Sequence, residues 1–138
     1  MQWNDATHGG FSISEPWLPL ADDVREKNVE RQLRDSASLL HFYKELISLR
    51  KKHPALRSGD LEFVDMHTDV LAYRRSADGE NTMIVLNFSA SPKRIDKSIL
   101  NASFKVLLST HREKGAVIRE MELIHPLEAT VLVREDEK

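Results

Sequence analysis

The residue types best suited to ligand binding lie within the first seventeen positions of this sequence. Three large aromatic residues, Trp3, Phe11 and Trp17, occur there together with Asp5 and His8. Aromatic rings can stack on the C–H faces of sugar rings, so these five residues form a candidate sugar-contact site. The alternative is that the rings pack on the rest of the protein, as large aromatic side chains commonly do.

The remainder of the sequence lacks the spacings typical of catalysis or metal binding. Asp60, Glu62 and Asp65, like Glu120 and Glu122, alternate with apolar residues, which places them on a solvated strand face. The six histidines form none of the close pairs that zinc sites use. Nucleophile elbows, phosphate-binding glycine loops and cysteines are absent from the sequence as well. We therefore predict no catalytic residue, no metal and no cofactor.

Composition narrows the class of protein further. The chain has 138 residues, of which 41% are apolar and 30% are charged, as in soluble globular domains. A net charge of −2 argues against nucleic acid or an acidic membrane surface as a partner. The sequence contains no apolar run of the roughly 18 residues that a membrane span requires, and no signal peptide. We expect a cytoplasmic protein with no nucleic-acid or membrane partner.

The first 35 residues are expected to form an irregular arm that is rich in glycine, proline and polar residues. A loop of this length is unusual in a compact domain unless it has a function or belongs to a larger structure. Within it, the loose spacing of Val24, Val29 and Leu33 suggests a short helix.

Residues 36–53 carry the clearest helical pattern. Asp35 or Ser36 is expected to cap the start of this helix, and Pro54 to end it. Apolar residues recur at helical spacing and predict an amphipathic helix. They are Leu39, Phe42, Tyr43, Leu46, Ile47 and Leu49.

After residue 59 the apolar period changes from 3.6 to 2, which predicts β-strands. Asp78 and Gly79 between two of them indicate a tight hairpin. The expected strands are 60–67, 69–76, 81–89, 93–99, 104–110, 116–124 and 129–135. Strands at this spacing without intervening helices indicate an antiparallel, Greek-key-like β-sandwich. We therefore expect a mainly β protein with an arm and helix over 1–58 and a sandwich over 59–138.

The order of these motifs resembles the C-terminal end of the α-amylase family of glycoside hydrolases, and within it the α-glucosidases and oligo-1,6-glucosidases. MQWND at 1–5 is similar to the stretch that follows the eighth barrel strand in that subgroup, and GGF and PW follow it here. Residues 43–50, YKELISLR, are similar to the last barrel helix of the family. Specific motifs cover residues 1 to about 90, and the general pattern covers the rest.

The resemblance implies that the arm is the last strand-to-helix loop of a (β/α)₈ barrel and that the sandwich is the C-terminal β-domain. Members of the family carry an aspartate nucleophile, a glutamate acid/base and a second aspartate on earlier barrel segments, and this chain has none of those positions. Retaining hydrolysis needs two carboxyl groups held about 5–5.5 Å apart. We therefore expect a structural C-terminal domain or fragment of an enzyme that acts on α-linked glucosides, inactive by itself.

Two other functions remain open. The first is a carbohydrate-binding module that stacks a weakly bound α-glucan on Trp3, Phe11 and Trp17. The second is a self-associating interaction domain, because an apolar helix face without a barrel needs another cover. The expected partner is accordingly either the rest of a barrel or another copy of the chain.

Overall fold

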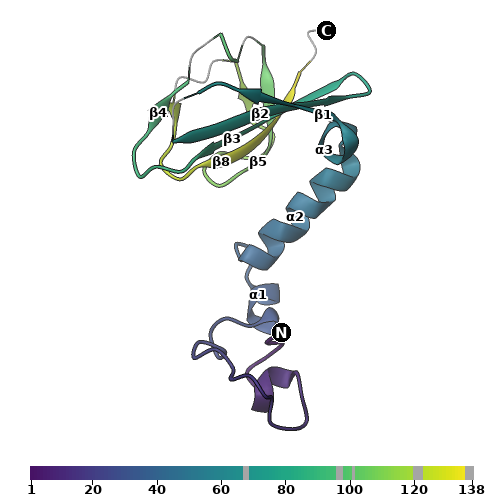
Figure 1. Cartoon of the computed structure of the whole chain (residues 1–138), viewed down its shortest axis with the longest axis vertical. Helices are drawn as coiled ribbons and strands as arrows, with labels where there is room; N and C mark the ends of the chain where they lie inside the picture. Colours follow the sequence, from purple (N-terminus) through teal and green to yellow (C-terminus); the bar gives the residue numbers. More distant parts are fainter. Residues whose placement is uncertain (67–68, 96–97, 101, 120–122, 136–138) are drawn as a thin grey trace. The chain divides into compact units, whose positions relative to one another are not determined.

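The computed structural model describes residues 1–66, 69–95, 98–100, 102–119 and 123–135 (Figure 1). The chain forms two compact units, Met1–Ser48 and Leu49–Lys138. The domain boundary expected at residues 58 and 59 from the change of period stays a prediction.

The first unit contains a single 3₁₀ turn, η1 (Thr7–Gly10), the short helix α1 (Val29–Arg34) and the start of α2 (Leu39–Lys52). The predicted short helix is therefore present. Helix α2 ends just before His53, whose backbone is extended, and Pro54 then occupies the first turn of a further helix, α3 (Pro54–Ser58). Proline suits that position because its fixed φ is helical and it needs no N–H partner there.

The predicted cap of α2 is wrong. The carboxylate of Asp35 accepts from Ala37 N at 2.9 Å, and Ser38 N donates to Asp35 O at 3.0 Å, so this segment forms a turn. The first helical hydrogen bond runs from Phe42 N to Ser38 O at 3.1 Å, which makes Ser38 the capping residue. The helix consequently starts at Leu39 rather than at residue 36.

The second unit is an antiparallel β-structure of two sheets, as predicted. The six-stranded sheet has the order β1-β2-β3-β8-β5-β6, and the two-stranded sheet pairs β4 with β7. The strands are β1 (Asp60–Val64), β2 (Val70–Ala77), β3 (Glu80–Asn87), β4 (Lys93–Arg94), β5 (Phe104–Ser109), β6 (Val117–Ile118), β7 (Leu123–Ile124) and β8 (Ala129–Arg134). Figure 1 shows β8 lying between β3 and β5, the two strands with which it pairs.

Three predicted strands differ from the observed ones. The expected strand 93–99 is reduced to β4, and the expected strand 116–124 is divided into β6 and β7, which belong to different sheets. Parts of both, residues 96–97 and 120–122, lie outside the described residues, as does residue 67 at the end of the first expected strand. The solvated face expected for Glu120 and Glu122 is outside them as well.

The predicted hairpin joins β2 to β3. Asp78 and Gly79 both have positive φ, 52° and 79°, as a two-residue type I′ turn requires. Ala77 and Glu80 pair directly on either side of the turn. A turn of this kind fixes the register of the two longest strands, whose eight residue pairs continue to Val70 and Asn87.

The hydrophobic core of this unit lies against one face of the six-stranded sheet. Alternate residues of β3 and β8, such as Met83, Val85 and Leu132, point into it. Its buried members are Ala72, Met83, Val85, Ile95, Leu100, Phe104, Val106, Ile124 and Leu132. Burial of this many aliphatic side chains is the main favourable contribution to the stability of the unit.

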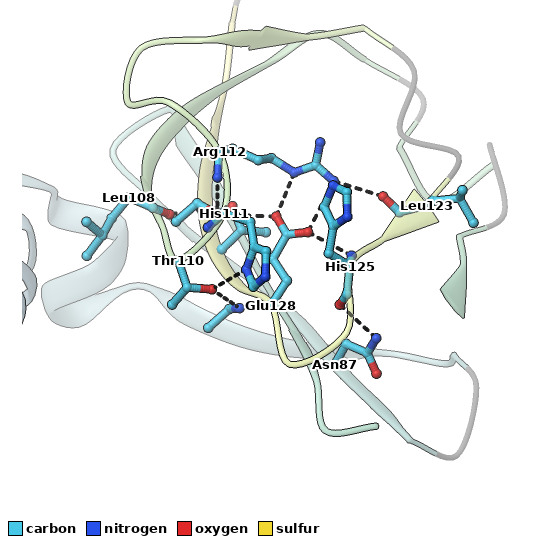
Figure 2. A network of polar contacts seen from close by, with 11 residues as sticks. Asn87, Leu108, Thr110, His111, Arg112, Leu123, His125 and Glu128 are labelled. Carbon is cyan, nitrogen blue, oxygen red and sulfur yellow. Dashed lines mark hydrogen bonds and ion pairs between the residues drawn. The ribbon is translucent and has the colours of Figure 1, made fainter. Parts of the chain in front are cut away.

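A buried ion pair holds one end of the sandwich together (Figure 2). The Glu128 side chain has no solvent exposure, and Arg112 Nε donates to its Oε1 at 2.6 Å. Ser109 Oγ donates to the same oxygen at 3.2 Å, while His125 N donates to Oε2 at 2.9 Å. The carboxylate therefore joins the loop after β5 to the turn before β8, and its charge is compensated from both.

Asn87 connects this network to the end of β3. Its side-chain nitrogen donates to His125 O at 2.9 Å and to Ser91 O at 2.8 Å, and its backbone N donates to Glu128 O at 2.9 Å. The ring of His125 stacks on that of His111, with centroids 5.5 Å apart (Figure 2). The polar groups at this end are thus satisfied within the protein.

Candidate functional site

The predicted site residues lie in the first unit, and all of them except Trp17 belong to a closed loop formed by residues 2–11. Trp3 N donates to Gly9 O at 2.8 Å, and Ala6 N donates to the Asn4 side chain at 3.1 Å. The backbone of Gly9 and Gly10 is left-handed, with φ of 64° at each. A Cβ on Gly10 would also lie 2.4 Å from Asn4 Oδ1, so the loop needs glycine at this position.

Polar side chains hold this loop against the start of α1. The Asn28 side chain accepts from Arg31 N at 3.0 Å and donates to Val24 O at 2.8 Å, and only 2% of the residue is exposed. Val29 N donates to Gln2 O at 3.1 Å. In the amide orientation that satisfies both of its groups, the Gln2 side chain also donates to Lys27 O and accepts from Ala21 N. The arm is therefore irregular, as expected, and specific hydrogen bonds hold its backbone in place.

A second set of polar contacts joins α1 to α2. Gln32 Oε1 accepts from Leu40 N at 3.0 Å, and Ser38 Oγ donates to Gln32 O at 2.7 Å. Asn28, Gln32 and Ser38 were not assigned a role from the sequence. The signal that could have identified two of them is the spacing of an amide or hydroxyl residue directly before each helix.

Many of the large apolar side chains of the first unit are exposed. Within residues 1–48, all of which are described, only Gly9, Asn28 and Ser38 are buried, and no hydrophobic residue is. The large exposed apolar residues of the unit are Met1, Trp3, Phe11, Ile13, Trp17, Leu18, Leu33, Leu39, Tyr43 and Ile47. Its backbone is thus ordered by polar contacts, while its apolar surface is available to a partner.

The structure brings together only some of the five predicted sugar-contact residues. Phe11 and Trp17 line one hollow of about 790 Å³, and Trp17 is 90% exposed. Asp5 lines a second hollow of about 580 Å³ together with charged residues of α1. Trp3 is exposed and His8 half-buried, and neither lines either hollow. The five residues therefore do not converge on one shared hollow.

Acidic residues of the first unit form ion pairs with nearby basic residues. Asp23 and Lys27 form an ion pair at 2.9 Å, one helical turn apart. The hydrogen bond from Lys27 lowers the pKa of Asp23, and the same bond raises the pKa of Lys27. Glu30 pairs in the same way with Arg34. These contacts neutralise carboxylates rather than preparing them for proton transfer.

The described residues include no group of three or more histidine, cysteine, aspartate or glutamate side chains placed to bind a metal. Among the helices of this part of the chain, none has both the length and the apolar character needed to cross a membrane.

Comparison with known proteins identifies the class of the chain. The family model of the α-amylase catalytic domain matches residues 1–59. The fold also matches the C-terminal region of solved MutB structures. This chain corresponds to the C-terminal part of an α-amylase-family glycoside hydrolase.

Its relatives include an oligo-1,6-glucosidase and a maltase. The oligo-1,6-glucosidase of Parageobacillus thermoglucosidasius is 32% identical over 136 residues, which cover 95% of this chain and 24% of that protein. Maltase A1 of Drosophila melanogaster is 35% identical over 141 residues, covering 96% of this chain and 24% of that one. The chain therefore spans about a quarter of the length of these relatives.

Solved structures also match nearly all of this chain over about a quarter of their own length. An inactive double mutant of MutB in complex with isomaltulose matches 97% of this chain with a TM-score of 0.82 and 30% identity. The trehalulose synthase MutB from Pseudomonas mesoacidophila MX-45 matches the same share with a TM-score of 0.78 and 29% identity. In both cases the match covers 24% of the solved chain.

Proposed function

We propose that this chain supplies the C-terminal part of an α-glucosidase-type hydrolase and acts structurally, without hydrolysing glycosides by itself. The observation that carries the proposal is the outward-facing apolar surface of the first unit, which has no buried hydrophobic residue of its own. Large exposed apolar side chains in this number are typical of a protein that has an interface with a partner. The match of residues 1–59 to a catalytic domain supports the rest of such a domain as the partner.

The chemistry of the arm agrees with a structural role. Hydrolysis with retention requires one carboxyl group as nucleophile and another as acid/base, about 5–5.5 Å apart on a rigid scaffold. In this unit Asp23 and Glu30 are each neutralised by a basic residue one turn away. The carboxylates that the family uses belong, by the resemblance, to barrel segments that precede the matched region.

The first test is the activity of the purified chain. We expect no turnover of maltose, isomaltose or a nitrophenyl glucoside above the blank, because the catalytic carboxyl groups belong, by the resemblance, to barrel segments that precede the matched region. Released glucose is the measurement for the first two substrates and nitrophenol for the third. Turnover that survives repurification and follows the protein through a second column would overturn the proposal.

Carbohydrate binding is a second candidate, favoured by one observation. Phe11 and Trp17 line the same hollow, and the Trp17 ring is almost fully accessible. If this hollow binds sugar, millimolar maltooligosaccharide will change the tryptophan fluorescence, and Trp17→Ala will abolish the change. Trp3→Ala is the matched control, because Trp3 is exposed but lies outside this hollow. An unchanged spectrum at millimolar sugar removes this candidate.

A further inference from the structure

One edge of the six-stranded sheet is formed by β1, which pairs with β2 alone in the part of the chain that the structure describes (Figure 1). The register of this pairing is regular from Asp60 to Val64. Natural sheets usually protect such an edge with lysine, proline or a β-bulge. The sequence of β1, DLEFV, contains neither lysine nor proline, and its register has no bulge. This edge is therefore open to a further strand.

The opposite edge of the sheet is better protected. Its strand β6 has only two residues, Val117–Ile118, and the adjacent β5 carries a register shift between Val106 and Leu108. Short edge strands and bulges both hinder pairing with another chain. The two edges thus differ, and β1 is the one that offers a regular surface for strand addition.

The turn between β2 and β3 determines which backbone groups of β1 are free. Ala77 and Glu80 flank its two central residues, and residues in that position exchange backbone hydrogen bonds. Hydrogen-bonded pairs alternate along an antiparallel strand, so the preceding residue, Ser76, points its backbone groups to the other side of β2. Ser76 is paired there with Asp60. The backbone groups of Asp60 are therefore used within the sheet.

The same alternation continues along β1. Glu62 and Val64, two and four residues after Asp60, also direct their backbone groups to β2. The N–H and C=O groups of Leu61 and Phe63 consequently point away from β2, to the free edge. The side chains of these residues are exposed, with Leu61 at 52% and Phe63 at 68%. Backbone donors, backbone acceptors and two apolar side chains are thus available along one edge.

We infer that two copies of the chain pair through β1 in antiparallel orientation, with Phe63 on the two-fold axis. In this register Phe63 lies opposite its counterpart, and Leu61 lies opposite the second copy's Asp65. Residues in these pairs exchange backbone hydrogen bonds, because their free groups face each other. A two-fold interface is self-complementary, since each copy presents the same surface. The inference goes beyond the proposed function and does not depend on it.

The side chains of this edge favour a second copy as the occupant. Phe63 ends an apolar row that continues through Tyr73 and Ile84. Its ring meets the edge of the Tyr73 ring, with centroids 6.3 Å apart. The two-fold pairing joins two such rows and places the exposed ring of Phe63 beside its counterpart. Aromatic cross-strand pairs of this kind stabilise a sheet.

Charge selects the register of the pairing. With Glu62 on the axis, two carboxylates would lie directly opposite each other, which is unfavourable. With Phe63 on the axis, Glu62 lies opposite the second copy's Val64, and Arg74 of its own chain is its cross-strand neighbour. The strand is acidic nevertheless, so we expect salt to strengthen the dimer by screening the repulsion between copies.

The first experiment traps the dimer through an introduced cysteine, since the chain contains none of its own. In Phe63→Cys the two new side chains meet across the axis, at a Cα separation of about 5.5 Å that a disulfide allows. In the matched control Leu61→Cys they are offset by about 13 Å along the strands, too far for a disulfide. Under mild oxidation we expect the Phe63→Cys dimer to form at least about tenfold faster on non-reducing gels.

The second experiment removes one outward-pointing donor. Leu61→Pro deletes an N–H at the free edge while leaving the hydrogen bonds between β1 and β2 in place. Sedimentation is expected to show a dimer of the unmodified chain whose dissociation constant rises at least about tenfold in this variant. The matched control Leu61→Thr keeps the N–H, and its dissociation constant should stay within about threefold of the unmodified value. Circular dichroism checks that each variant is folded, and the disulfide comparison decides if Leu61→Pro is not.

Three results would overturn the inference. They are a monomer at all concentrations, equal disulfide rates in the two cysteine variants, and a dimer that folded Leu61→Pro leaves unchanged. Weakening of the dimer by salt overturns it as well, because two copies of an acidic strand repel each other. None of these outcomes changes the proposed function, which rests on the first unit.

Discussion

Replacing Glu128 with alanine is expected to lower the free energy of unfolding of the sandwich unit by about 3–5 kcal/mol. The carboxylate is fully buried, and four donors point at it, two of them from Arg112. Its removal leaves the Arg112 guanidinium largely buried without a counter-charge, and it leaves Ser109 Oγ and His125 N without their acceptor. Removal of one partner of a buried pair costs far more than the net contribution of the pair.

A second variant separates the effect of the charge of Glu128 from that of its volume, and a third is a control at an exposed position. Glu128→Gln keeps the volume and one acceptor oxygen, so we expect a smaller loss than for alanine. Glu113→Ala removes a carboxylate from an exposed position in the same region and is expected to change stability by no more than about 0.5 kcal/mol. Both tryptophans lie in the first unit, so unfolding in urea is followed by far-ultraviolet circular dichroism. A loss below about 1 kcal/mol for Glu128→Ala would contradict the role of the ion pair.

Local pattern was sufficient to predict the main elements of the fold. The period-2 segments gave the long strands β2, β3, β5 and β8, because each has a face that must be buried. The Asp78-Gly79 turn was predictable because few other sequences adopt positive φ at two successive residues. Helix α2 was predictable from its apolar spacing, but its first residue was not. Gln32, a residue of the preceding helix, supplies one of the acceptors there, and such a contact leaves no local signal.

The sequence could not predict the contacts that organise the sites, because these contacts join residues that are far apart in the chain. Glu128 and Arg112 are sixteen residues apart, and Asn87 reaches His125 across thirty-eight. Alternation alone would place a charged residue such as Glu128 in water, because the compensating arginine comes from another loop. For the aromatic residues of the arm the sequence leaves both alternatives open, because whether they pack on protein or bind sugar depends on a partner surface.

The central claim is that the first unit is shaped to complete a catalytic domain. It predicts that activity appears only when this chain meets the rest of such a domain. A truncated oligo-1,6-glucosidase from Parageobacillus thermoglucosidasius, lacking the last quarter that this chain matches, provides that part. Glycosidase catalysis exceeds the uncatalysed reaction by at least about a millionfold, so reassembly of even a small fraction is measurable.

The decisive measurement is the rate of nitrophenyl glucoside hydrolysis by the two parts together and by each part alone. The account predicts a rate in the mixture at least about a hundredfold above either part, increasing with the concentration of this chain until the truncated enzyme is saturated. No gain in rate, when sedimentation shows that both parts are folded and present, would contradict the account.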